Sequence, residues 1–358
     1  MTIVTQFQIQ YYQFLNQLGQ TTQDLPPFAQ DASNLIHLYR TMVLIRTFDT
    51  KAVNLQRTGK LGTYASTLGQ EAITVGIGSA LDTHDVFCPY YRDYGTQLLR
   101  GVKMSEILAY WGGDERGNNF SSAMAKEDFS FCVPIASQCL HAAGIAVAMK
   151  LRHQHRATLV TMGDGATSEG EFYEAINLAG AWQLPIVFVV NNNQWAISVP
   201  RKAQTSASTI AQKAIAGGFE GEQVDGNDII AVRDRVEKAL IKARSGKGPT
   251  LIEAVTYRLC DHTTADDANR YRDKEELKKA WECDPIVRLK LYLMNNNFWS
   301  NSAEEELLGE CSKQVEAAVH DYISTPTPPL EDMFDFHYAN MPANLIAQKQ
   351  MALTEGSD

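Results

Sequence analysis

The stretch of sequence that decides the fold runs over residues 158–193 and reads TLVTMGDGATSEGEFYEAINLAGAWQLPIVFVVNNN. Thr158–Met162 is a short apolar run of the length of a strand, and it ends abruptly at Gly-Asp-Gly. A helical pattern follows over Glu171–Trp182, and a second apolar run covers Ile186–Val190. This spacing of strand, helix and strand predicts two parallel strands joined by a helical crossover.

The alternation continues on both sides of this unit. A helix rich in Ala over Ala142–Leu151 precedes it, and a helix over Ile229–Ser245 and an apolar strand over Thr250–Tyr257 follow it. Further upstream, apolar residues recur at three- and four-residue steps over Asn34–Arg57, which predicts a long amphipathic helix. The sequence therefore predicts an α/β fold, a doubly wound parallel sheet with helical extensions at its N- and C-terminal ends.

We expect three segments along the chain. Residues 1–60 form an N-terminal arm and helix, 61–270 the α/β domain, and 271–358 a helical extension. The first 30 residues are rich in Gln and nearly uncharged, and they close on Pro26-Pro27, as in an extended arm.

Composition excludes several classes of protein. The chain has 358 residues, 44% of them hydrophobic, and a formal net charge of −10 without a Lys/Arg run, which argues against a nucleic-acid partner. The six cysteines form no C-x-x-C pair, which favours thiols in a reducing compartment over a disulfide framework or a zinc site. No basic residue except His37 precedes Arg40, and no apolar run approaches the ~20 residues that span a bilayer. We therefore expect a bacterial cytoplasmic protein without a membrane partner.

Polar residues follow both central strands. Gly163-Asp164-Gly165 ends the first strand, and Asn191-Asn192-Asn193 ends the second. The carboxyl ends of parallel strands meet at one edge of a sheet, where ligands bind. Glycines let the backbone approach a phosphate, and a carboxylate with an amide oxygen suits a Mg²⁺ ion that bridges diphosphate oxygens. The alternative is an Asp-Gly turn and Asn residues that only terminate a strand.

The longer stretch MGDGATSEGEFYEAINLAGAWQLPIVFVVNNNQWAISVP (162–200) resembles the thiamine diphosphate motif of one family. That family is the alpha subunit of the decarboxylating component of pyruvate and branched-chain 2-oxo acid dehydrogenases. The resemblance implies that Asp164 and Asn193 bind Mg²⁺ through their side chains and that Trp195 adds its carbonyl oxygen. The cofactor contacts that it implies in this stretch are Asp164, Gly165, Ala166 and Asn193.

Other segments resemble the same family, and together they span about residues 34–341. In YYRDYG, Tyr91 and Arg92 match the pair that holds the diphosphate and borders the aminopyrimidine. In VPIASQ, Val133 matches a backbone contact to the aminopyrimidine, and Ile135 matches the apolar wedge that bends the cofactor. TYRLCDHTTADDANRYRD resembles the flexible active-site loop, in which His262 is the catalytic residue and a cofactor contact. The loop residues are too polar to fold onto themselves by burying apolar area, so we expect the loop to be disordered until cofactor and beta subunit are both present.

The resemblance implies oxidative decarboxylation of a 2-oxo acid, with transfer of the acyl group to lipoyl on a dihydrolipoamide acyltransferase. It also implies a beta subunit, because the family's activating glutamate lies on a second α/β domain and only one is recognised here. The expected assembly has two alpha and two beta chains.

Different segments of the sequence favour different substrates. The GKLG and TSEGEFYEAINLAGAW segments favour pyruvate, the HTTADD loop favours a branched-chain acid such as 3-methyl-2-oxobutanoate, and acetoin is a weaker third choice. Thr63 stands where many relatives of the resembled family carry a Phe that lines the substrate pocket, which bears on the substrate. Thr263 and Asp273 stand where animal branched-chain enzymes carry two phosphorylated serines, which argues against regulation by a dedicated kinase.

Two readings from other classes are open to test. A non-catalytic scaffold would keep the fold without the metal residues, but Asp164 and Asn193 are present. A nucleotide-binding dehydrogenase would carry G-x-G-x-x-G after a strand, and the sequence has no such motif there.

Overall fold

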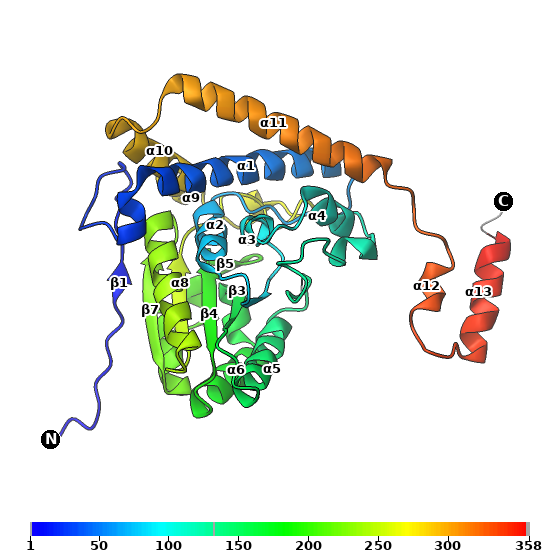
Figure 1. Cartoon of the computed structure of the whole chain (residues 1–358), viewed down its shortest axis with the longest axis horizontal. Helices are drawn as coiled ribbons and strands as arrows, with labels where there is room; N and C mark the ends of the chain where they lie inside the picture. Colours follow the sequence, from blue (N-terminus) through cyan, green and yellow to red (C-terminus); the bar gives the residue numbers. More distant parts are fainter. Residues whose placement is uncertain (1, 132, 356–358) are drawn as a thin grey trace.

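Six parallel strands form the central sheet of the structure, a computed structural model that describes residues 2–131 and 133–355. The sheet order is β1-β7-β8-β4-β3-β2 (Figure 1). The strands are β1 Tyr11–Tyr12, β2 Val86–Cys88, β3 Thr158–Gly163, β4 Ile186–Asn192, β7 Glu220–Asp225 and β8 Thr250–Val255. A hairpin of β5 (Trp195–Ala196) and β6 (Val199–Pro200) follows β4.

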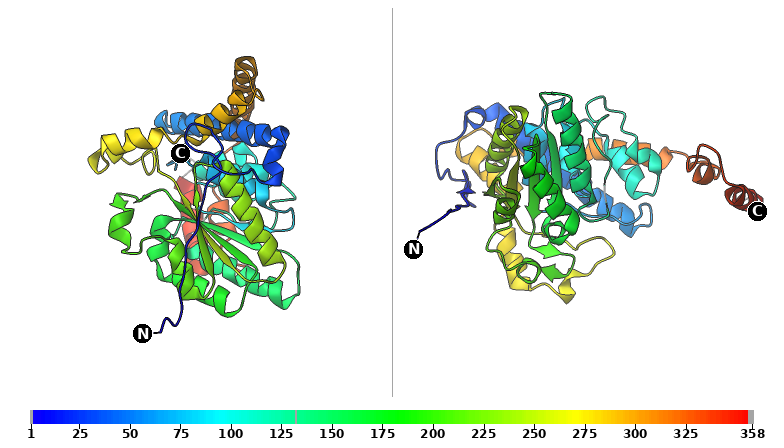
Figure 2. Two further views of the ribbon diagram at one scale, coloured as in Figure 1. Left: turned by 90° about the vertical axis from the view of Figure 1, so that its left-hand side faces the viewer. Right: turned by 90° about the horizontal axis from the view of Figure 1, so that it is seen from below.

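Helices cover both faces of the sheet, because the central strands are apolar on both sides. Along β4, Val187 and Val189 belong to one hydrophobic cluster and Phe188 and Val190 to the other. Helices α5 (Ser137–Leu151) and α6 (Gly170–Ala181) pack on the second cluster, and α2 (Glu71–Ala80) and α8 (Ile229–Arg244) pack on the first. Figure 2 shows the strands between these layers. The predicted doubly wound parallel sheet is confirmed.

The long helix α1 (Ala32–Arg57) lies across one end of the sheet, alongside α11 (Asn301–Ser324) (Figure 1). Tyr39 of α1 donates a hydrogen bond to Glu304 of α11, and one hydrophobic cluster contains Phe48 of α1, Val189 of the sheet and Val315 of α11. Helices α1 and α11 of the predicted extensions thus pack onto the α/β core.

Shorter helices complete the structure. They are α3 Tyr94–Leu99, α4 Met104–Trp111, α7 Arg201–Gln204, α9 Lys274–Trp281, α10 Pro285–Asn295, α12 Asp332–Asp335 and α13 Ala343–Glu355. Helices α12 and α13 stand away from the body at the end of an extended segment (Figure 1). Among the described residues, no helix has the length and the apolar character needed to cross a membrane.

The N-terminal arm is extended as predicted, but it is also part of the sheet. Strand β1 pairs in parallel with β7, with Tyr11 opposite Gln223. The backbone N–H groups of Phe14 and Leu15 donate to the buried carboxylate of Asp228, at 2.6 and 2.8 Å. These bonds attach the arm to the start of α8.

Candidate active site

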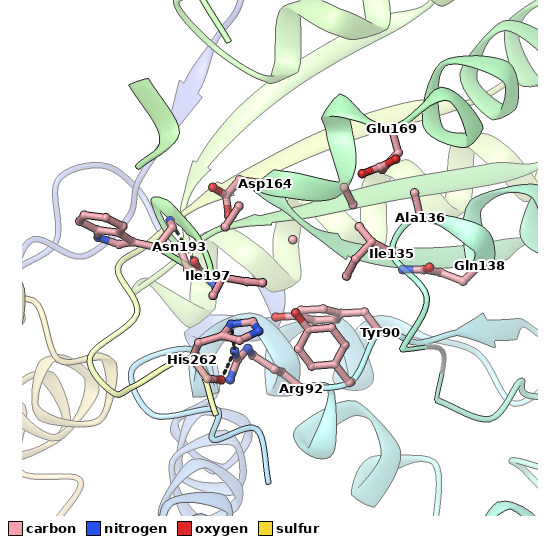
Figure 3. A pocket seen from close by; sticks show the side chains of 16 residues that line it. Tyr90, Arg92, Ile135, Ala136, Gln138, Asp164, Glu169, Asn193, Ile197 and His262 are labelled. Atoms are coloured by element: carbon pink, nitrogen blue, oxygen red, sulfur yellow. Dashed lines mark hydrogen bonds between the residues drawn. The ribbon is translucent and has the colours of Figure 1, made fainter. Parts of the chain in front are cut away.

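A cavity of about 240 Å³ lies at the carboxyl edge of the sheet. The segments that follow β2, β3 and β4 each contribute to its wall, as the topology of a parallel sheet predicts. Figure 3 shows the side chains that point into it. The cavity is lined by Tyr90, Tyr91, Arg92, Ile135, Ala136, Gln138, Gly163, Asp164, Gly165, Ala166, Glu169, Asn193, Trp195, Ala196, Ile197 and His262.

The cavity brings together nearly all the site residues that the sequence predicts. These are Tyr91, Arg92, Ile135, Asp164, Gly165, Ala166, Asn193, Trp195 and His262. Val133 is not among the described residues that line it, and its side chain is half exposed. Thr63, which stands where relatives have a pocket Phe, is exposed and also lies outside the lining.

Asp164 and Asn193 supply two oxygen-bearing side chains from neighbouring strand ends. Asp164 is only 1% exposed, and Gln204 donates to its Oδ2 at 2.7 Å. Burial raises the pKa of Asp164 to about 6, because water no longer stabilises the ionised carboxylate. A bound cation would reverse that shift.

The donor set of the described residues fits a hard cation that is shared with a ligand. No group of three or more His, Cys, Asp or Glu side chains in the described chain is arranged to hold a metal by itself. Mg²⁺ commonly binds one or two protein oxygens and completes its shell with phosphate oxygens and water. Asp164 and Asn193 match that requirement.

Two buried arginines lie at the site without an acidic partner among the described residues: Arg92 lines the cavity, and Arg258 contacts the lining residues Trp195, Ile197 and His262. Arg92 and Arg258 are 1% and 0% exposed, and neither forms an ion pair with any carboxylate of the described residues. Arg92 donates to the carbonyl of His262 at 2.6 Å, and Arg258 donates to the carbonyl of Ile197 at 2.9 Å. Burial and the charge of Arg92 lower the pKa of Arg258. Because buried charges are normally paired, this arrangement favours an anionic ligand such as a diphosphate.

His262 is held in its neutral form beside these arginines. Its Nδ1 lies 3.1 Å from Nη2 of Arg92 and 3.4 Å from Nη1 of Arg258. Burial, and then the charges of Arg92 and Arg258, lower its pKa to about 3. A guanidinium can only donate, so Nδ1 accepts and the ring hydrogen resides on Nε2. His262 therefore offers an N–H donor at its Nε2.

The loop that carries His262 forms hydrogen bonds within itself, and the dependence of its order on cofactor and beta subunit stays a prediction. The carboxylate of Asp266 accepts from the backbone N–H of His262 at 2.8 Å, and Asp261 accepts from Ala268 N–H at 2.9 Å. Asp273 caps the start of α9 by accepting from the N–H groups of Glu275 and Glu276. Polar side chains thus form local hydrogen bonds and caps along this loop, in which Ala268 is buried.

Strained backbone borders the cavity. Ala136, the N-cap of α5, has φ of 67°, and Ile197 in the β5–β6 turn has φ of 53°. Positive φ is unusual for an alanine and a clear outlier for a β-branched residue. Such conformations cost energy and cluster at ligand sites, where the surrounding structure enforces them.

The sequence reasoning missed several residues of the site. Arg258 lies four positions before His262 in TYRLCDH, but a single arginine in a polar segment carries no signal of burial. Gln138 and Glu169 line the cavity, and Gln70 lies behind it in GKLGTYASTLGQEA. Only their positions in the folded chain identify them.

The fold and the site define an α/β protein with a cavity at the carboxyl edge of its sheet, lined by Arg92, Asp164 and Asn193. The chain belongs to the dehydrogenase E1 component family, whose family model matches residues 39–331.

Curated relatives agree with this assignment. The chain is 42% identical over 319 residues to the 3-methyl-2-oxobutanoate dehydrogenase subunit alpha of Mycobacterium tuberculosis, covering 89% of this chain and 86% of that protein. It is 40% identical over 321 residues to the pyruvate dehydrogenase E1 component subunit alpha of Acholeplasma laidlawii, covering 85% and 92%. It is 37% identical over 349 residues to the same subunit of Staphylococcus aureus, covering 97% and 94%.

Proposed function

We propose that the chain is the alpha subunit of pyruvate dehydrogenase and carries out thiamine-diphosphate-dependent oxidative decarboxylation of pyruvate, with acetyl transfer to lipoyl on the acyltransferase. The observation that carries the proposal is the cavity in which buried Arg92, without an acidic partner among the described residues, lies with Asp164 and Asn193. Arg258, also buried and without such a partner, contacts the lining residues Trp195, Ile197 and His262. That combination matches a diphosphate with its Mg²⁺ ion.

Each part of the cofactor has candidate partners in this chain. Arg92 and Arg258 would bind diphosphate oxygens, while Asp164, Asn193 and the carbonyl of Trp195 would hold Mg²⁺. The Trp195 carbonyl lies 3.4 Å from Nη1 of Arg258, a weak contact that an ion could replace. Thiamine diphosphate, when bound, supplies a carbon nucleophile and an electron sink for decarboxylation.

The chain's own residues bind and orient the reactants. Neutral His262 would donate from Nε2 to the substrate carboxylate, a hydrogen bond that needs no protonation of the ring. Ile135 is 47% exposed and lines the cavity, where its side chain would press the cofactor into a bent shape. Orientation of this kind acts on the chemical step.

A beta subunit would complete the site, in an assembly of two alpha and two beta chains. The cavity of about 240 Å³ is smaller than the roughly 300–1,000 Å³ of sites that enclose a ligand of this size. The side chain of Ile135 lines the cavity and is 47% exposed, which fits a wall that another chain supplies. The proposal includes the division at residues 60 and 270 and a bacterial cytoplasmic location.

The substrate is the part of the proposal most in need of a test. A branched-chain acid is the second candidate, because the relative from Mycobacterium tuberculosis is named for 3-methyl-2-oxobutanoate and is 42% identical. The chain should be copurified with its beta subunit, and kcat/KM should be measured for pyruvate, 3-methyl-2-oxobutanoate and acetoin. A higher value for the branched acid would replace pyruvate as the substrate. Absence of activity with every one would contradict the enzyme assignment.

A further inference from the structure

Behind the proposed metal site lies a series of buried hydrogen bonds between side chains. Asn191 Nδ2 donates to the hydroxyl of Tyr90 at 2.7 Å, and that hydroxyl donates to Oε1 of Gln70 at 3.3 Å. Asn193 Nδ2 donates to the same Gln70 oxygen at 3.1 Å. All four side chains are buried, with exposed fractions of 4% or less. Gln70 is therefore the shared acceptor of the series.

The direction of these hydrogen bonds is set by a backbone group. The N–H of Trp195 lies 3.2 Å from Asn193 Oδ1, and a backbone N–H can only donate. Asn193 must therefore turn its oxygen toward Trp195 and its NH₂ group toward Gln70. Gln70 in turn must present Oε1, which leaves its Nε2 without a hydrogen-bond partner among the described residues.

The opposite arrangement would disable the metal site. If the Gln70 amide were reversed, its NH₂ group would face the Asn193 NH₂ group, and Asn193 could hydrogen-bond to it only by turning its oxygen toward Gln70 and away from Trp195 N–H. An amide oxygen has two lone pairs, and Trp195 N–H uses one of them. The second lone pair can reach a cation only if Gln70 accepts the hydrogen bond from the Asn193 NH₂ group.

We propose that Gln70 is a positioning residue that fixes the Asn193 amide with its oxygen toward the cation. Tyr90 reinforces this role, since its hydroxyl donates to the same Gln70 oxygen. The inference rests on the proposed function, because it assumes that Asp164 and Asn193 hold Mg²⁺. Outer partners of metal ligands commonly change metal affinity by about 10- to 100-fold when they are mutated.

The test measures Mn²⁺ binding to the full chain assembled with its beta subunit, in the presence of thiamine diphosphate. Free Mn²⁺ is followed by electron paramagnetic resonance, which needs no turnover. The central variant is Gln70→Met, which keeps the size of the side chain and removes the acceptor. The matched control is Gln97→Met, because Gln97 is a second buried glutamine, on α3, whose side-chain atoms have no partner among the described residues. Gln70→Glu keeps the acceptor oxygen and tests for rescue.

We expect Gln70→Met to weaken Mn²⁺ binding by at least about 10-fold, while Gln97→Met and Gln70→Glu bind it as tightly as the unmodified protein. Normal Mn²⁺ binding by Gln70→Met, or equal loss in Gln70→Glu, would overturn the inference. If Gln70→Met does not fold, Tyr90→Phe provides the test. We expect this variant to lose less Mn²⁺ affinity than Gln70→Met, and an unchanged Mn²⁺ affinity would contradict the inference. Asp164→Asn distinguishes failure of the Gln70 inference from failure of the proposed metal site. Normal Mn²⁺ binding by that variant would refute the metal site itself.

Discussion

Arg92 and His262 hold each other across the cavity: Nη2 of Arg92 lies 2.6 Å from the carbonyl oxygen of His262 and 3.1 Å from its Nδ1. One guanidinium thereby fixes both the backbone and the ring of a residue 170 positions later in the chain. This contact joins the segment after β2 to the active-site loop, and with burial it lowers the pKa of His262.

Removing Arg92 should raise the pKa of His262. Burial lowers that pKa most, and the charges of Arg92 and Arg258 lower it further, to about 3. Arg92→Met should move the pKa upward toward the ordinary value of 6.5 without reaching it, because Arg258 and burial remain. The pKa is measured from the His262 ring resonances in NMR spectra over a pH series. Arg270→Met, an exposed arginine of the same loop, should leave it unchanged; an equal shift in both variants would contradict the assigned cause.

Replacing Asp164 should stabilise the metal-free chain and abolish its metal binding. The folded-state pKa of about 6 lies above the usual 3.8, so the folded protein binds more protons between these values and loses stability as pH rises from about 4 to 6. At pH 7 the cost is roughly 3 kcal/mol. Asp164→Asn should regain most of this free energy of unfolding at pH 7 and little of it at pH 4, as measured by urea unfolding. A destabilised variant at pH 7 would contradict the prediction.

Metal affinity should fall as the pH is lowered through about 6. Mg²⁺ needs the ionised carboxylate of Asp164, and protonation removes that ligand. Isothermal titration with Mg²⁺ and thiamine diphosphate between pH 5 and pH 8 measures the effect in the alpha–beta assembly. An affinity independent of pH over this range would show that Asp164 does not hold the metal.

Ile135→Ala should lower kcat more than it lowers cofactor affinity. Ile135 lines the cavity, and its proposed role is to orient the reacting groups rather than to supply binding energy. Steady-state kinetics of the assembly measure kcat, and cofactor titration measures the cofactor affinity. Leu140→Ala on α5 is the control, since Leu140 is partly exposed and does not line the cavity. Similar losses in both variants would make Ile135 an ordinary packing residue.

Gly78→Ala should destabilise the chain by about 1–3 kcal/mol, the usual cost of overpacking. A Cβ at Gly78 would lie 2.8 Å from the Cα of Thr96, so α2 and α3 would have to separate. Gly144→Ala is the matched control in α5, where a Cβ meets nothing within 4 Å. That variant should gain about 0.5–1 kcal/mol from helix propensity. Free energies of unfolding in urea that rank the variants the other way would refute the packing argument.

The success of the sequence reasoning follows the strength of the local signal. Strand β4 begins as an uninterrupted apolar run, β3 is mostly apolar, both are followed by polar residues, and both lie within two residues of their predicted bounds. Helix α2 was not predicted because Gly76 and Gly78 lower its helix propensity, and their purpose lies in contacts with α8 and α3. Strand β7 begins Glu-Gly-Glu and lacks a clear alternation.

The residues of the site also divide into those that the sequence identifies and those that only the folded structure identifies. Asp164 and Asn193 could be predicted because a parallel sheet places its strand ends together, whatever the rest of the chain does. Gln70 and Arg258 could not, because their roles depend on burial and on partners far along the sequence. The order of the His262 loop also depended on specific pairs, such as Asp261 with Ala268, which composition does not reveal.

The lack of acidic partners for Arg92 and Arg258 among the described residues affects the stability of the subunit in a cell. A ligand that binds only the folded chain adds stability in proportion to the logarithm of its concentration over its dissociation constant. An empty site with Arg92, Arg258 and ionised Asp164 buried carries an electrostatic penalty that an anion and a cation together would relieve. Scarcity of the vitamin-derived cofactor would then reduce the amount of the subunit through faster degradation, in addition to its activity.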